Sequence, residues 1–230
     1  MQPKKRLDDT VSYLKKKRNV LLLTTSNRWA GNHEIPKSSQ LAYYINKKLG
    51  KKSKIIEVAT LKIYMCEGNV STSKGNNCGV KDAVLKDKKK NPSGCHRCYA
   101  SINNKDDELW KISKELLSSD AVLFFGSIRW GQANAIYQKL IERLTWLENR
   151  HSTLKEDNIL GNIDAGVIFV GQNWNGVNVV KIQRKVLDFF GFKTPKVLSW
   201  NWQYTKNAYD ESQDSYMNSI KKFKKDFKFN

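Results

Sequence analysis

Residues 120–144 read DAVLFFGSIRWGQANAIYQKLIERL, and this stretch decides the predicted fold. Its residues 121–125 form a short apolar run of the kind that is covered on both faces of a parallel sheet. Gly126, Ser127 and Gly131 open the polar loop that follows, and apolar residues at helical spacing then predict an amphipathic helix. We expect a ligand near this loop, because open α/β sheets bind ligands at the carboxyl ends of their strands.

Other strands and helices alternate along the chain in the same way. Strands are predicted at residues 19–24, 54–58, 121–125, 165–170 and 196–200. Helices are predicted at residues 36–49, 107–117, 135–144 and 177–190, with a tail helix from about residue 210. This alternation predicts an α/β fold with a doubly wound parallel sheet and helices on both faces.

The length and composition favour one domain. A chain of 230 residues with 40% hydrophobic content can bury one core, and no long linker divides it. We expect a basic segment at residues 1–18, followed by a single domain at residues 19–230. Residues 61–104 hold all four cysteines and show little periodicity, which predicts an insertion or a separate site. A cytoplasmic protein is expected, since the start lacks the apolar core of a signal peptide.

The charge is strongly positive, at +19, which raises nucleic acid or an anionic membrane as a partner. The excess is mainly lysine and is spread over every predicted surface, whereas readers of bases and phosphates favour arginine. A solvated lysine-rich surface is the simpler interpretation, so we expect neither partner. The tail helix carries Tyr216, Ile220, Phe223 and Phe227 on one stripe, and packing on the sheet is favoured over a membrane-surface role.

Three loops that follow predicted strands begin at Thr25, Gly126 and Gly171, and they should converge on one edge of the sheet. The first loop combines hydroxyls, amides and one arginine ahead of a helix N-terminus, where free N–H groups and the helix dipole favour a phosphate. Neither a Walker loop nor a dinucleotide fingerprint is present. The alternative is that these serine and asparagine residues only cap the helix and form turns.

The other two loops contain Trp130 and Trp174, each flanked by glycine and by side chains that can form hydrogen bonds. A phosphate at the first loop and a slot with polar edges at the others match a mononucleotide with a large flat ring. Either tryptophan could instead be a core residue or a dimer contact.

Two motifs give the chain a resemblance to a known family. Residues 26–32 read SNRWAGN and residues 126–131 read GSIRWG. The flavodoxin-like NAD(P)H-dependent FMN reductases carry S-x-R-x-x-G-N after their first strand and G-S-P-x-Y-W-G before a long helix. The chain resembles this family from residue 19 to about residue 202, with Ile128 in place of the proline. The resemblance implies a flavodoxin-like parallel sheet of five strands.

The resemblance also implies an FMN site. Carried over by position, the residues that would hold the FMN phosphate are Ser26, Arg28, Asn32, Ser38 and Ser39. Those that would line the isoalloxazine ring are Ser127, Ile128, Arg129, Trp130 and Gly131, with Gln172, Asn173, Trp174 and Gly176 on its other side. The flavin would carry the chemistry, so no catalytic acid or base is expected from the protein.

The implied activity is electron transfer from NADH or NADPH through FMN to an acceptor: a free flavin, a quinone, a nitro compound or a metal centre. A homodimer is implied as well, with its contact expected at residues 146–153 around Trp146, Arg150 and His151. Two alternatives from other classes stay open. One is an electron carrier that does not use NAD(P)H, and the other is a lysine-rich module that binds nucleic acid or a membrane surface on a flavodoxin-like scaffold.

The four cysteines, Cys66, Cys78, Cys95 and Cys98, are separated by eleven, sixteen and two residues. In a cytosolic protein they could form a tetrahedral zinc site or hold an iron–sulfur cluster, with His96 as a further candidate ligand. The related iron–sulfur flavoproteins carry a tighter cysteine motif at a similar place. The alternative is that the thiols are unligated or that two of them form a redox pair.

Overall fold

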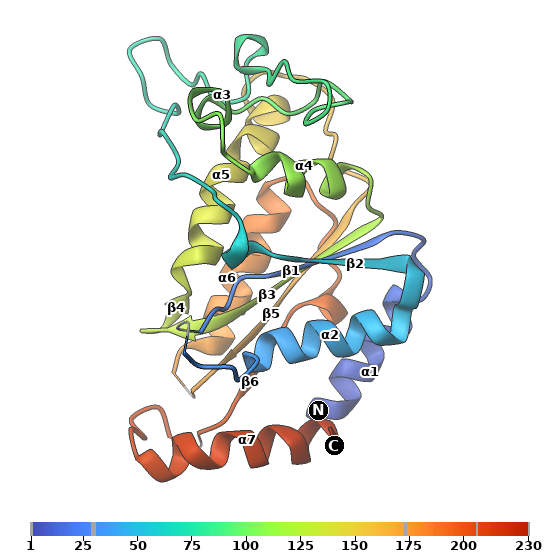
Figure 1. The fold of residues 1–230 in the computed structure, drawn as a ribbon, viewed down its shortest axis with the longest axis vertical. Coiled ribbons are helices and arrows are strands. Elements are labelled where there is room, and N and C mark those ends of the chain that lie inside the picture. Colours follow the sequence, from blue (N-terminus) through green and yellow to red (C-terminus); the bar gives the residue numbers. More distant parts are fainter. Residues whose placement is uncertain (1, 29–30, 173, 206, 230) are drawn as a thin grey trace.

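The computed structural model describes residues 2–28, 31–172, 174–205 and 207–229. Its centre is a six-stranded sheet whose five parallel strands lie in the order β2-β1-β3-β5-β6 (Figure 1). The parallel strands are β1 (Val20–Thr24), β2 (Ser53–Glu57), β3 (Ala121–Arg129), β5 (Asp164–Gly171) and β6 (Trp200–Gln203). The expected doubly wound parallel sheet is confirmed, and its strand order is that of flavodoxin-like sheets.

The sheet has six strands rather than the expected five because β3 runs on past the predicted apolar core. Its end turns back into β4 (Gln132–Ala133), which pairs antiparallel with Ile128 and Arg129 of β3. The loop expected after residue 125 is therefore a short hairpin that projects from the carboxyl edge of the sheet. Trp130 and Gly131 lie at its turn, and both have positive φ angles, of 49° and 68°.

Helices cover both faces of the sheet, as expected. One face carries α4 (Leu109–Leu117), α5 (Ala135–Ser152) and α6 (Gly176–Phe189), and the other carries α1 (Pro3–Leu14), α2 (Lys37–Leu49) and α7 (Gln213–Phe227) (Figure 1). Alternate residues of β3 divide between the two cores. Phe124 packs with the first group of helices and Phe125 with the second. This division follows from the period of two along a strand.

Two elements differ from the sequence prediction. The basic segment at residues 1–18 forms α1, which buries Leu7, Val11 and Leu14 on one face. The last strand begins at Trp200, since η4 (Lys196–Leu198) is a turn of 3₁₀ helix that follows Pro195. The two segments are joined by a hydrogen bond in which Trp200 Nε1 donates to Thr10 Oγ1 over 3.0 Å.

The insertion at residues 61–104 lies over the far end of α5, at the top of Figure 1. It contains only η3 (Lys81–Ala83) and α3 (Tyr99–Asn103), while the short turns η1 (Gly50–Lys52) and η2 (Val58–Thr60) flank β2. No helix in the described parts of the chain is long and apolar enough to cross a bilayer.

The insertion covers the segment in which a dimer contact was expected. Trp146 is fully buried and Arg150 is only 7% exposed. Arg150 Nη1 donates to the carbonyl of Cys95 over 3.1 Å, and His151 Nε2 lies 2.9 Å from the carbonyl of Phe190. Both contacts are within the subunit. The prediction that Trp146 forms a dimer contact is therefore wrong, because the insertion already occupies its surroundings.

Candidate functional site

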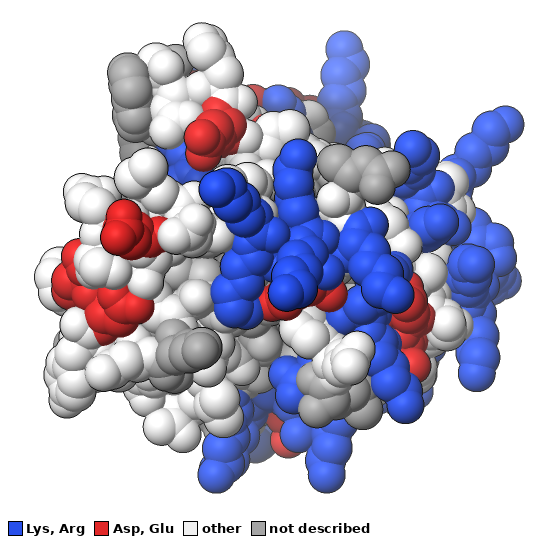
Figure 2. Space-filling model, turned by 90° about the horizontal axis from the view of Figure 1, so that it is seen from below, with Lys and Arg blue, Asp and Glu red and all other residues white. Residues whose placement is uncertain are grey.

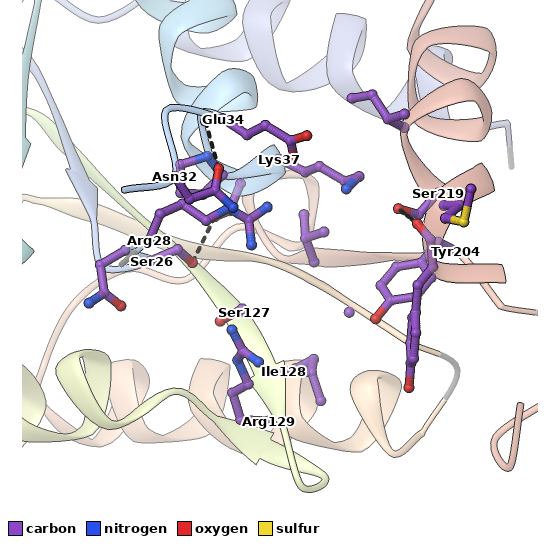
Figure 3. A pocket seen from close by; sticks show the side chains of 18 residues that line it. Ser26, Arg28, Asn32, Glu34, Lys37, Ser127, Ile128, Arg129, Tyr204 and Ser219 are labelled. Atoms are coloured by element: carbon purple, nitrogen blue, oxygen red, sulfur yellow. Dashed lines mark hydrogen bonds between the residues drawn. The ribbon is translucent and has the colours of Figure 1, made fainter. Parts of the chain in front are cut away.

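A pocket of about 340 Å³ opens at the carboxyl edge of the sheet (Figure 3). It lies between the loop after β1, the ends of β3 and β5, and the segment from β6 to α7. The pocket therefore stands where a doubly wound sheet is expected to bind its ligand.

Asn134 fixes the two loops that build this pocket. Its Oδ1 accepts a hydrogen bond from Ser127 N over 3.0 Å, and its Nδ2 donates to the carbonyl of Thr25 over 2.9 Å. The side chain is only 7% exposed, so water does not compete for these bonds. A Cβ at Gly126 would stand 2.7 Å from Asn134 Oδ1, which explains the glycine at the end of the buried strand.

The N-terminus of α2 forms one end of the pocket. The N–H groups in the first turn of any helix have no intrahelical partners. Here the N-cap residue, Pro36, provides no side-chain cap for them. Ser38 Oγ donates to Ser26 Oγ over 2.9 Å and thereby ties the helix to the loop after β1. Free N–H groups and the helix dipole make this end suitable for an anion.

Two cations stand at the same end (Figure 3). Arg28 Nε is buried, and no described residue forms a hydrogen bond with it. Burial lowers the pKa of Lys37, and the positive charge of Arg28 lowers it further, while Glu34 acts in the opposite direction. A bound anion would relieve this repulsion and give the buried Nε of Arg28 a partner.

The other end of the pocket is less polar. Ile128 and Arg129 come from the end of β3, and the Arg129 guanidinium points into the cavity (Figure 3). A Cβ at Gly171 would stand 2.6 Å from the Cβ of Ile128, so only glycine allows β5 to end so close to β3. Tyr204 stands across the pocket from these residues. Burial raises its pKa, while the positive charges of Arg129 and Arg28 lower it by less.

Helix α7 closes this side. Tyr216, Met217 and Ile220 line the pocket from its first two turns. The rest of the helix is held on β6 by Phe223, whose ring centroid lies 5.2 Å from that of Trp202. The Nε1 of Trp202 also donates to an Asp226 carboxylate oxygen over 2.8 Å. The packing of the tail helix on the sheet, expected from its apolar stripe, thus provides a wall of the pocket.

The chain is similar to several solved structures. No family model and no curated protein sequence matches the chain. It is similar to the crystal structure of RosB with bound 8-demethyl-8-formylriboflavin-5'-phosphate, at 13% identity and a TM-score of 0.56, over 91% of this chain and 75% of that one. The chain has the flavodoxin-like fold.

Weaker similarities are of the same kind. An azoreductase from Bacillus anthracis str. Sterne is 15% identical with a TM-score of 0.46, over 92% of this chain and 99% of that one. An NAD(P)H:quinone oxidoreductase from Methanothermobacter marburgensis is 9% identical with a TM-score of 0.48, over 93% and 99% of the two chains.

Within this flavodoxin-like fold, most of the predicted site residues line one of two cavities. Those that line the pocket are Ser26, Arg28, Asn32, Ser38, Ser127, Ile128 and Arg129. Trp130, Gly131 and Trp174 line a different cavity, on the other side of the β3–β4 hairpin. Asn173 lies outside the described residues, as do Trp29 and Ala30 of the first motif.

The remaining predicted residues do not line the pocket. Ser39 is buried, at 3% exposure, and Gly176 begins α6. Gln172 Nε2 donates to the carbonyl of Ala208 over 3.0 Å and to Glu211 Oε1 over 2.8 Å, so it anchors the segment that leads to α7.

The sequence analysis missed Lys37, Tyr204 and the face of α7. The chain contains many lysines, so composition does not single out Lys37. Its position directly after Pro36, at the expected start of a helix, could have marked it as part of an anion site. Tyr204 and α7 reach the pocket only through long-range packing.

The structure does not support a metal site at the cysteines. Cys66, Cys78, Cys95 and Cys98 are free, and no group of three or more His, Cys, Asp or Glu in the described residues could hold a metal ion. Burial and the neighbouring Cys98 and Cys66 raise the pKa of Cys78 to about 12. The insertion packs instead on a buried ion pair of Arg143 and Asp107, whose guanidinium donates to the Tyr64 carbonyl and to Ser101 Oγ. The predicted zinc or iron–sulfur site is therefore not supported.

His96 is likewise a structural residue. Its side chain is buried against Trp146, with ring centroids 5.1 Å apart, and its Nδ1 lies 2.8 Å from Ser113 Oγ. Burial lowers the pKa of His96 from 6.5 to about 4, so the imidazole is neutral at physiological pH.

This burial predicts a pH dependence of stability. The unfolded chain binds a proton on His96 below about pH 6.5, whereas the folded chain does so only near pH 4, so the free energy of unfolding should fall as the pH decreases between these values. The loss from this group should reach about 3 kcal/mol. Urea unfolding at pH 7, 6, 5 and 4 measures it, and the H96Q variant should show a flatter pH profile. Parallel profiles for the two proteins would contradict the assignment.

Proposed function

We propose that the pocket binds FMN, with the phosphate at the N-terminus of α2 and the ring toward Ile128, Arg129 and Tyr204. The observation that carries this proposal is the excess of positive charge at the phosphate end, where Arg28 and Lys37 stand with one carboxylate, Glu34. A buried Arg28 Nε without a described partner, Lys37 and an uncapped helix face one cavity. The structure of RosB, which holds a riboflavin 5'-phosphate derivative on the same fold, supports this choice of ligand.

The donors present fit a phosphate monoester. The Ser26 hydroxyl, the Asn32 side chain and the Arg28 guanidinium lie around one end of the cavity, with Lys37 as a further cation. The Ser38 hydroxyl joins them through its hydrogen bond to Ser26. Charge-assisted hydrogen bonds of this kind are stronger than neutral ones. Figure 2 shows many lysine and arginine side chains on the end of the molecule where α7 lies, and such a field raises the local concentration of anionic ligands.

We propose that the protein is an NAD(P)H-dependent oxidoreductase. FMN, when bound, would supply the hydride and electron transfer, so the chain needs no catalytic acid or base. Its own residues would bind and orient the group. Arg28 and Lys37 would hold the phosphate, while Ile128 and Tyr204 would exclude water from the ring and Arg129 would place a positive charge beside it. The acceptor would be a small molecule such as a flavin, a quinone, a nitro compound or a metal centre. A homodimer remains part of the proposal.

An absorption spectrum tests the proposal directly. The purified protein is titrated with FMN, freed of excess flavin, and measured without oxygen before and after addition of NADPH and NADH. We expect one flavin per chain, with absorption bands that bleach on addition of at least one reduced nucleotide. FMN uptake without bleaching would favour the electron carrier. A protein that takes up no FMN and oxidises neither nucleotide would contradict the proposal and favour the lysine-rich binding module, which predicts salt-sensitive binding to DNA or anionic lipid.

A further inference from the structure

A second cavity lies beside the β3–β4 hairpin, on the side away from the pocket described above. We call it the tryptophan cleft. It has a volume of about 460 Å³ and is lined by residues of the hairpin and of α6 and its N-terminal loop, among them Trp130, Trp174, Asn175, Ile182 and Gln183. The proposed FMN site uses Arg129, the residue next to Trp130, so a single hairpin separates the two cavities.

Two exposed tryptophans form a corner of the cleft. Trp130 is 85% exposed and Trp174 is 42% exposed, and their ring centroids lie 6.1 Å apart at an interplanar angle of 89°. Trp130 and Asn175 both have positive φ angles, of 49° and 56°. The Nδ2 of Asn175 donates to the carbonyl of Gly131 over 2.8 Å and so joins the hairpin to the start of α6. A two-residue hairpin turn needs positive φ angles and asparagine adopts them readily, but they are rare for tryptophan, and residues held in rare conformations cluster at functional sites.

A buried amide supplies the polar contact. Gln183 lines the cleft and is 7% exposed, and its Oε1 forms no hydrogen bond with any described residue. A buried acceptor without a partner is unfavourable. The torsion at the end of a glutamine side chain is soft, so the amide can turn toward a ligand that offers a donor.

The cleft is neutral in a chain that carries 41 lysine and arginine residues. None of the described residues that line it is charged. The part of a ligand that enters it should therefore be uncharged, because nothing there would pair with an ion. It should be flat to lie against the tryptophans, and it should carry a hydrogen-bond donor for Gln183.

We propose that the tryptophan cleft binds the adenine base of a nucleotide. Adenine is flat and neutral, and aromatic side chains bind bases by stacking. A glutamine amide pairs with adenine through two hydrogen bonds, accepting from the exocyclic amine and donating to N7. A purely apolar ring would leave Gln183 Oε1 without a partner. The proposal does not depend on bound FMN, and the adenine could belong to a free nucleotide or to NAD(P)H.

The test measures adenosine binding by calorimetry, with the full chain and no flavin. We expect saturable binding of adenosine, and a loss of affinity of about tenfold in W130A and in Q183L. Trp130 is mostly exposed and leucine conserves the volume of glutamine, so both variants should fold. F189A is the matched control, since Phe189 is 72% exposed on the same helix and does not line the cleft. It should bind adenosine like the unmodified protein.

The same variants distinguish the two sources of adenine. An equal loss of NADH and adenosine affinity in W130A would assign the cleft to the dinucleotide, and a loss for adenosine and AMP alone would assign it to a free nucleotide. Absence of saturable adenosine binding, or binding that survives both W130A and Q183L, would overturn the proposal. FMN titration of the same proteins separates this outcome from the proposed function, because both variants should take up FMN normally.

Discussion

Replacement of Arg143 by methionine is expected to lower the free energy of unfolding by about 3–5 kcal/mol, because it leaves a buried carboxylate without its partner. The side chains of Arg143 and Asp107 are both 0% exposed, and Nη1 donates to Oδ1 over 2.8 Å while Nη2 donates to Oδ2 over 3.0 Å. Arg143 Nη1 also donates to the carbonyl of Tyr64 over 2.7 Å. Its Nη2 donates to Ser101 Oγ over 3.0 Å as well, so this one guanidinium joins α5 to both ends of the insertion.

The electrostatics of the pair agree with this expectation. Burial raises the pKa of Asp107, but the hydrogen bond and charge of Arg143 outweigh it and hold the pKa below its ordinary value. Urea unfolding measures the effect. The matched control is K62M, because Lys62 and Asp106 form an exposed ion pair at 59% and 56% exposure, and such pairs contribute at most about 1 kcal/mol. The double variant R143M/D107L should recover much of the loss. Equal losses in R143M and K62M would contradict the central role of this pair.

Much of the fold could be predicted from the sequence because its central strands are covered on both faces. β1, β3 and β5 each contain a continuous apolar run, and the structure begins each of them within one residue of its predicted start. The helix α1 could not be recognised in the same way. Its buried Leu7, Val11 and Leu14 are separated by polar residues, and most of its contacts are with α7 and η4 near the other end of the chain.

The candidate site could be predicted only in part. The density of hydroxyl and amide groups after β1 identified one end of the pocket. The residues at the end of β3 identified the other, less polar end. The sequence groups Trp130 and Trp174 with the other predicted site residues, because it does not reveal that β3 continues to Arg129. The hairpin turn then places Trp130 on the side of α6, away from Tyr204. The C-terminal wall could not be foreseen, because apolar spacing predicts that a helix packs on the sheet but not at which edge.

The second large effect is expected at the phosphate end of the pocket. The double variant R28Q/K37M should bind FMN at least about 100-fold more weakly, because each lost charge-assisted hydrogen bond costs about 1.5–3 kcal/mol. Riboflavin, which lacks the phosphate, should bind both proteins with affinities that agree within about threefold. Quenching of flavin fluorescence measures both ligands. The affinity of the unmodified protein for FMN should also fall as salt is added, and that of the double variant should fall less.

A matched control keeps the helix and removes a distant charge. Lys47 and Lys48 lie in the last turn of α2, at the end opposite the pocket, so the variant K47Q/K48M lowers the net charge by the same amount as R28Q/K37M. It should bind FMN almost normally, because charges beyond a Debye length of about 8–10 Å are screened in physiological salt. Equal losses in the two variants would mean that net charge alone attracts the ligand. If R28Q/K37M loses as much affinity for riboflavin as for FMN, Arg28 and Lys37 stabilise the loop rather than bind the phosphate. The phosphate would then have to bind elsewhere.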